Sequence, residues 1–98
     1  MKAVFITFDQ AHYERIIDTL DRLNCRGYTA WQQVTGRGSV NGEPHYGTHA
    51  WPSLASAIIT MVADEMVAHL LEKLREYNDE RPKLGLRAFV WKIEEEGV

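Results

Sequence analysis

The chain has 98 residues, of which 45% are hydrophobic and 26% charged, a composition typical of one soluble globular domain over residues 1–98. The formal net charge of −3 argues against general binding to nucleic acid, because binding to a phosphate backbone needs a basic surface. One cysteine, Cys25, excludes an intrachain disulfide and favours a reducing compartment, and no apolar run approaches the roughly 20 residues of a membrane span. We expect a cytoplasmic protein that binds no nucleic acid and does not insert directly into a membrane.

The first half of the chain predicts a strand, a helix and a second strand. In residues 2–8 both alternating sets of side chains are largely apolar, so we expect a strand covered on both faces. Asp9 is suited to cap the helix that follows, in which apolar residues recur at helical spacing from Tyr13, and Gly27 is expected to end that helix. The run 28–34 is rich in β-forming residues and predicts the second strand.

The second half predicts a long loop, a strand, a helix and a last strand. Residues 35–52 contain four glycines and two prolines and show no sustained period, which predicts the loop. Residues 54–62 predict a third strand, and Asp64 is expected to cap a second helix whose apolar stripe begins at Val67. Residues 86–93 predict a fourth strand, which follows a polar breaker at 78–82.

The order β-α-β-β-α-β predicts an α+β, ferredoxin-like fold with a four-stranded antiparallel sheet, two helices on one face and a long loop between strands 2 and 3. Two helices leave the other face of the sheet open. Because the first, third and fourth strands are apolar on both sides, that face needs a second cover, and another copy of the chain is the simplest one. The pattern therefore predicts self-association.

The loop at 35–52 is the main candidate for function, because loops of this length inside compact domains are usually functional or disordered. Its start, Gly36-Arg37-Gly38, combines a backbone that can form an anion-binding nest with a guanidinium that can hold a phosphate or carboxylate. The spacing fits neither the dinucleotide fingerprint nor a P-loop. A flexible hairpin loop without a ligand is the alternative reading.

Two histidines, His45 and His49, stand near the end of the loop. Histidine is the commonest side chain on transition metals, so the pair could bind a divalent metal ion together with a third ligand such as Glu43. Prolines and glycines around the pair make a helix there unfavourable, so its i, i+4 spacing carries little weight. Simple hydrogen bonding by two loop histidines is the alternative.

Aromatic and basic residues add two further candidates. Trp31, Tyr46 and Trp51 could stack on a base or pack at a subunit interface. Lys83 and Arg87 flank Gly85 before the last strand and could neutralise an anion, although solvated surface charge would also explain them. No catalytic constellation stands out, so the sequence favours a protein that is not an enzyme.

The chain resembles PII-like proteins, which are relatives of the nitrogen-regulatory P-II signal-transduction proteins. The resemblance covers nearly the whole length. It is carried by Met1-Lys2 at the first strand, Gly27-Tyr28-Thr29 at the second, Val34-Thr35-Gly36-Arg37-Gly38 before the loop, and Pro82-Lys83-Leu84-Gly85-Leu86-Arg87-Ala88-Phe89-Val90 at the last strand. The end of the loop, 45–52, departs from that family pattern.

This resemblance implies a homotrimer with clefts between subunits that bind an adenine nucleotide such as ATP, ADP or AMP. The long loop would correspond to the T-loop, through which P-II proteins regulate a partner such as a membrane transporter or an enzyme. By position in the family motif, one wall of the cleft would contain Thr29, Gly36, Arg37 and Gly38. The opposite wall would contain Lys83, Gly85 and Arg87.

Three functions are therefore carried forward. The first is a trimeric PII-like regulator whose effector is a small anion. The second is a metal-ion sensor or binding protein that uses His45 and His49. The third is a small enzyme of the dimeric α+β barrel type, with a pocket lined by Trp31 and a histidine.

Overall fold

The computed structural model describes residues 1–81 and 83–98. The chain forms four strands and two α-helices in the expected order, with single 3₁₀ turns at Gln10–His12 and Asp64–Met66. The elements are β1 (Lys2–Asp9), α1 (Tyr13–Arg22), β2 (Tyr28–Val34), β3 (Ala55–Val62), α2 (Val67–Asp79) and β4 (Arg87–Lys92). Each 3₁₀ turn directly precedes an α-helix, so each connection from strand to helix is short.

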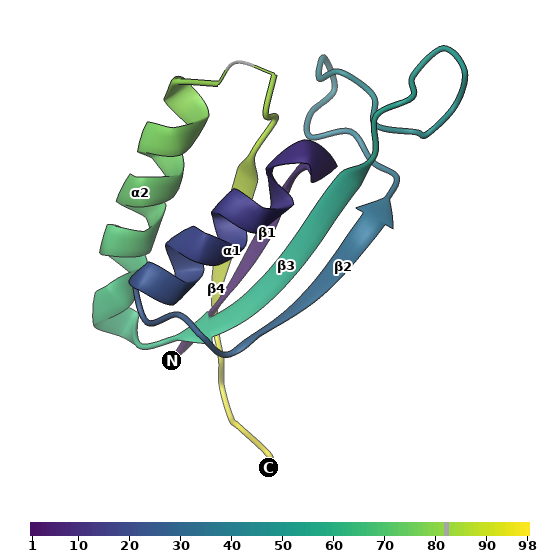
Figure 1. Ribbon diagram of the computed structural model, residues 1–98. Coiled ribbons are helices and arrows are strands. Elements are labelled where there is room, and N and C mark those ends of the chain that lie inside the picture. The colour runs from purple at the N-terminus through teal and green to yellow at the C-terminus, as the bar shows by residue number, and fades with distance from the viewer. Residues whose placement is uncertain (82) are drawn as a thin grey trace.

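The strands form one sheet in the order β2-β3-β1-β4, and every pair of neighbours is antiparallel. Both helices lie on the same face of this sheet, as Figure 1 shows. This arrangement is the ferredoxin-like α+β fold, so the predicted fold class is confirmed. Among residues 1–81 and 83–98, no helix combines the length and the apolar character needed to cross a membrane.

The core lies between the sheet and the helices. Val4, Ile6 and Phe8 alternate along β1 and point to this side, where Ile16 and Leu20 of α1 cover them. Further core residues come from β3, α2 and the segment before β4: Ile58, Val62, Leu70, Leu74, Leu84 and Leu86. The apolar stripes read from the sequence therefore meet in one layer.

Within residues 1–81 and 83–98, no helix covers the opposite face of the sheet, which is rich in large apolar side chains. Phe5 at its centre lies opposite Ile59 of β3 and Phe89 of β4. We call this the open sheet face; its large side chains are Phe5, Trp31, Ile59, Met61, Phe89 and Trp91. The four most exposed of them remain 46–48% exposed in the single chain. The expectation that this side needs another cover therefore agrees with the structure.

The first helix ends earlier than the sequence predicts. It stops at Arg22, and Asn24 takes the left-handed turn conformation with φ of 60°, after which the Cys25 N–H donates to the Leu20 carbonyl at 2.8 Å. Asparagine tolerates this conformation better than most residues, so the chain can turn before Gly27. The prediction that Gly27 ends the helix was wrong.

The second helix is not capped by the side chain of Asp64. The cap position of α2 is Met66 and that of the 3₁₀ turn before it is Ala63; neither makes a side-chain cap bond, and the Asp64 carboxylate instead accepts from the amino group of Met1 at 2.8 Å. That hydrogen bond lowers the pKa of the Asp64 carboxyl. Pairing with a full positive charge has replaced the predicted capping of backbone N–H groups.

Candidate functional site

The long loop leaves the sheet at the end where β2 finishes and β3 begins. The start of α1 and the segment before β4 lie at the same end of the molecule (Figure 1). A small bridge closes the loop at its base: the Gly36 N–H donates to the His45 carbonyl at 2.9 Å, and the His45 N–H donates to the Gly36 carbonyl at 2.8 Å. The loop is thereby divided into a base at 36 and 45, a first lobe at 37–44 and a second lobe at 47–53.

His45 anchors the loop base to the core. The residue is 6% exposed, and its Nε2 lies 3.1 Å from Oδ2 of Asp9. Asp9 also accepts from the Ala11 N–H at 2.8 Å, and its own N–H donates to the Leu84 carbonyl at 2.9 Å. It therefore caps the 3₁₀ turn at Gln10–His12 that leads into α1, whereas the cap position of α1 itself is His12, which makes no side-chain cap bond. One residue therefore joins the end of β1, the loop base and the segment before β4.

Gln10, the next residue, joins the two strand ends from which the loop leaves, at Gln33 of β2 and Ser56 of β3. Its side-chain oxygen accepts from the Gln33 N–H at 2.7 Å and from the Ser56 hydroxyl. Gln33 has φ of 57° and lies where the pairing of β2 with β3 shifts register. Sequence reasoning missed Gln10, because a glutamine in a helix-start region carries no motif. The irregularity of β2 was missed because glutamine gives no sign of a positive φ.

Two arginines reach the first lobe from opposite sides. Arg37 donates to the Tyr46 hydroxyl through Nη2 at 2.6 Å and Nε at 3.1 Å, and to the Val40 carbonyl through Nη1 at 3.3 Å. Arg87, at the start of β4, donates to the Gly38 carbonyl at 2.9 Å. Both arginines are exposed to solvent.

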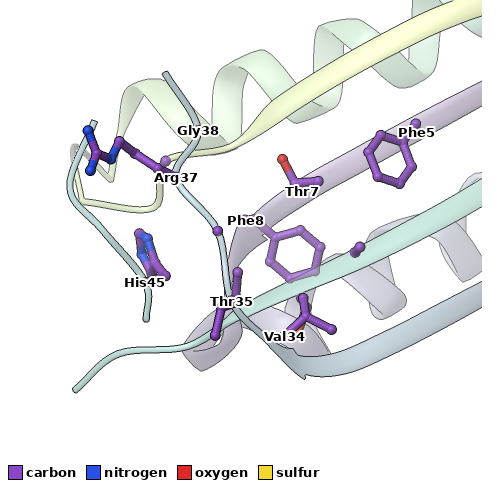
Figure 2. A pocket seen from close by; sticks show the side chains of 13 residues that line it. Phe5, Thr7, Phe8, Val34, Thr35, Arg37, Gly38 and His45 are labelled. Atoms are coloured by element: carbon purple, nitrogen blue, oxygen red, sulfur yellow. The ribbon is translucent and has the colours of Figure 1, made fainter. Parts of the chain in front are cut away.

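Two hollows meet at this loop base. The first, here called the sheet-side hollow, lies between the loop base and the open sheet face and is lined by Phe5, Thr7, Thr35, Gly36, Arg37 and Ala57, among others. In Figure 2 the Arg37 side chain extends away from Phe5 and Thr7, toward the far side of the loop. The second, here called the loop-side hollow, is lined by Ser39, Glu43, Asn78, Lys83, Gly85 and Arg87, among others. Gly38, His45 and Gly85 border both hollows, so the two hollows adjoin each other at the loop base.

Six of the seven residues expected to bind an effector lie around this region. Gly36, Arg37, Gly38 and Gly85 border the sheet-side hollow, and Gly38 and Gly85 join Lys83 and Arg87 around the loop-side hollow. Gly85 has φ of 62°, a left-handed conformation that favours glycine. The two groups, 36–38 and 83–87, are 45 or more residues apart in sequence, and the fold brings them together.

Thr29, the seventh, lies elsewhere. It is in β2 opposite Ile59, and it borders neither hollow. Its expected role in a cleft stays a prediction. Within a single chain, neither hollow joins Thr29 to the other six positions.

The two loop histidines have different surroundings. His45 is buried against Asp9, whereas His49 is exposed in the second lobe, where the Thr48 N–H donates to the Trp51 carbonyl at 2.8 Å. Within the residues that the structure describes, no three His, Cys, Asp or Glu side chains are grouped as a metal site requires. Metal binding by His45 and His49 stays a prediction without a ready-made site.

The three aromatic candidates do not form one surface. Trp31 belongs to the open sheet face, where it lies opposite Ala57. Tyr46 is the acceptor for Arg37, and Trp51 is exposed in the second lobe. Trp31 lines neither hollow, so the pocket that the small-enzyme alternative expects beside Trp31 and a histidine stays a prediction.

The model for the nitrogen regulatory protein P-II family matches residues 1–98. The chain belongs to the P-II family. The resemblance read from the sequence is therefore confirmed, and P-II membership makes the protein one of a family of signalling regulators rather than of enzymes. A comparison with curated protein sequences found no match.

Solved structures of P-II relatives are similar to this chain over most of its length. One is CPII, a nitrogen regulatory PII-like protein from Thiomonas intermedia K12, bound to ADP, AMP and bicarbonate; it has 28% identity and a TM-score of 0.75, covering 94% of this chain and 84% of CPII. The apo form of CPII has 27% identity and a TM-score of 0.71, covering 94% and 87%. A PII-like signalling protein from Thermus thermophilus, at 24% identity and a TM-score of 0.69 over 94% and 85%, supports the fold alone.

Proposed function

We propose that this chain is a trimeric PII-like regulator that binds an adenine nucleotide in clefts between its subunits. The observation that carries the proposal is the gathering of Arg37, Lys83 and Arg87 around two hollows at one end of a single chain. Three cations beside two glycine-containing segments suit the phosphates of a nucleotide, because guanidinium and ammonium groups and backbone N–H groups bind phosphate oxygens. The related CPII was solved with ADP and AMP, which supports the same ligand class here.

The open sheet face supports the trimer. Its large apolar side chains surround Phe5, and several are about half exposed in the isolated chain. An apolar surface of this kind marks an interface in most soluble proteins, and closed symmetric assemblies of identical subunits are the usual result. The sheet-side hollow opens beside the same face, so a neighbouring subunit packed there would complete its wall.

The loop supports a role in signalling. Its second lobe presents Trp51 and His49 to solvent, and its first lobe is held to the cleft by two arginines. A segment that touches the effector site and also projects from the molecule can transmit occupancy to a partner such as a transporter or an enzyme. Such a regulator would act in the cytoplasm.

Calorimetric titration of the purified protein with ATP, ADP and AMP, each with and without bicarbonate, tests the effector. We expect heat of binding with a dissociation constant in the micromolar range for at least one nucleotide. Arg87→Ala should weaken the binding of that nucleotide at least about tenfold, because a bond from a charged donor to phosphate contributes roughly 1.5–3 kcal/mol. Lys92→Ala, at the far end of β4, is the matched control. No heat and no thermal shift with any nucleotide would refute nucleotide binding.

Light scattering tests the assembly. We expect a mass three times that of the 11.3 kDa chain. Phe89→Asp should give monomers, because it puts a charge into the apolar face, whereas Val40→Asp changes an exposed apolar residue outside the sheet and should leave a trimer. A dimeric wild type would contradict the proposal and would favour the α+β barrel architecture.

A further inference from the structure

We propose that Arg37 and Arg87 act as internal ligands of the first lobe, and that an anionic effector competes with the lobe for them. Binding would then release residues 38–44 from the cleft. This inference rests on the proposed function, because it needs an anion in that cleft. It adds the physical step that joins occupancy of the cleft to a change in the loop.

Arg37 is the only lysine or arginine between Thr35 and Leu54, and its guanidinium is engaged inside the loop. The side chain of Arg37 crosses the loop base and donates twice to the Tyr46 hydroxyl. Its Nη1 donates to the Val40 carbonyl at the tip of the first lobe. Figure 2 shows the result: the side chain is directed away from the hollow that its own backbone lines. In this state Arg37 is not available to an anion in the sheet-side hollow.

Arg87 holds the same lobe from the sheet. Its Nη1 donates to the Gly38 carbonyl at 2.9 Å, and Gly38 packs so closely there that a Cβ on it would lie 3.1 Å from the Gly85 carbonyl oxygen. The two arginines best placed for the effector are therefore the two that fix the lobe. Neither can take a phosphate oxygen with the same N–H groups without leaving its present acceptor.

The first lobe has little else to hold it. The Gly42 N–H donates to the Ser39 carbonyl at 3.0 Å and makes a local turn, but Val40 at the tip is 87% exposed. The loop base differs, because its attachment uses the Gly36–His45 bridge and the pair between His45 and Asp9, neither of which involves an arginine. Loss of the arginine contacts should therefore free the lobe and leave the base in place.

The arginines should bind an anion more strongly than they bind the first lobe. The present acceptors are a phenol oxygen and two backbone carbonyls, all neutral, whereas a phosphate or carboxylate carries full negative charge and can accept two parallel bonds from one guanidinium. The contacts with the lobe oppose binding and should lower the effector's affinity. Tyr46 is thus a positioning residue that restrains Arg37, and removal of its hydroxyl should strengthen effector binding.

The experiment compares the wild type with Tyr46→Phe, using ADP as the probe. Calorimetry gives the affinity, and hydrogen exchange of the amides at 38–44 gives the state of the lobe with and without ADP. We expect Tyr46→Phe to bind ADP roughly twofold to tenfold more tightly, as loss of one competing hydrogen bond implies, and to exchange faster at 38–44 without ligand. Tyr13→Phe, on α1, is the matched control and should change neither quantity.

In the wild type, ADP should speed exchange at 38–44 and leave the amide of His45 protected. If ADP binds but slows exchange at 38–44, or if Tyr46→Phe binds ADP no more tightly than the wild type, the competition is refuted while the proposed function stands. If the wild type binds no ATP, ADP or AMP, the proposed function and this inference fail together.

Discussion

The base of the long loop and its lobes belong to one segment but are held by different kinds of contact. The base is attached by partly buried side chains of two consecutive residues, Asp9 and Gln10, at the end of a central strand of the sheet. The first lobe is attached by exposed arginines. Buried hydrogen bonds are expensive to leave unpaired, whereas exposed ones exchange readily with water or a ligand. The contrast indicates that the loop base is fixed and that the first lobe can move.

The largest effect on stability is expected from Asp9→Ala. It removes the cap of the turn at Gln10–His12 and leaves the buried His45 ring without its partner. The free energy of unfolding should fall by about 2–3 kcal/mol, as the sum of a lost cap and an unpaired buried group. Chemical denaturation measures it.

His49→Ala is the control, because it changes an exposed histidine of the same loop and should alter stability by less than about 0.5 kcal/mol. Equal effects of the two variants would mean that the base is no better attached than the second lobe.

Gln10→Ala is expected to have the next largest effect. It removes the acceptor for the Gln33 N–H and for the Ser56 hydroxyl, which is buried. The loss should be about 1–2 kcal/mol in the same denaturation experiment. Gln32→Ala removes only the exposed 3.3 Å contact with Gln10 and should be nearly neutral. A neutral Gln10→Ala would show that water replaces this clamp without loss.

The sequence predicts the candidate effector residues of this region, but it does not predict the contacts that attach the loop to the sheet. Periodicity and β-forming composition located the strands and helices, and the family motif assigned Gly36, Arg37, Gly85 and Arg87 to one cleft. The fold brings these residues around two adjoining hollows, and their binding of an effector stays a prediction. Attachment was not predictable. The His45–Asp9 and Gln10–Gln33 contacts join residues 36 and 23 positions apart, and neither side chain differs from an ordinary loop or cap residue until the register of the strands is fixed.

The errors have the same origin. Gly27 and Asp64 each fit a local rule for the end or start of a helix, and each rule was overridden by a neighbour. The chain turns at Asn24, which has a positive φ, before it reaches Gly27. The Asp64 carboxylate pairs with the amino group of Met1 and does not cap the helix. The proximity of Met1 to Asp64 follows from the pairing of β1 with β3, which local propensity does not contain.

A smaller effect, of opposite sign, is expected from Gln33→Gly. Gln33 adopts a positive φ that glycine accepts without strain, so this variant should be stabilised by about 0.5 kcal/mol after the greater entropy of the unfolded chain is subtracted. The same change at Gln32 should destabilise, because Gln32 has no positive φ to relieve and glycine only adds entropy to the unfolded chain. Thermal denaturation of the two variants gives the comparison. Destabilisation by Gln33→Gly would indicate that the side chain itself supports the stem.

The smallest effect is expected from Val40→Ser at the tip of the first lobe. Val40 is the most exposed large apolar residue before the C-terminal Val98, and its carbonyl, not its side chain, accepts from Arg37. Stability should therefore change by less than about 0.5 kcal/mol. Effector affinity should also stay within about twofold, since the arginine contacts persist, whereas binding of a partner that grips the tip should weaken. A large loss of stability would mean that the tip is packed in solution, and the division between a fixed base and a movable lobe would not hold.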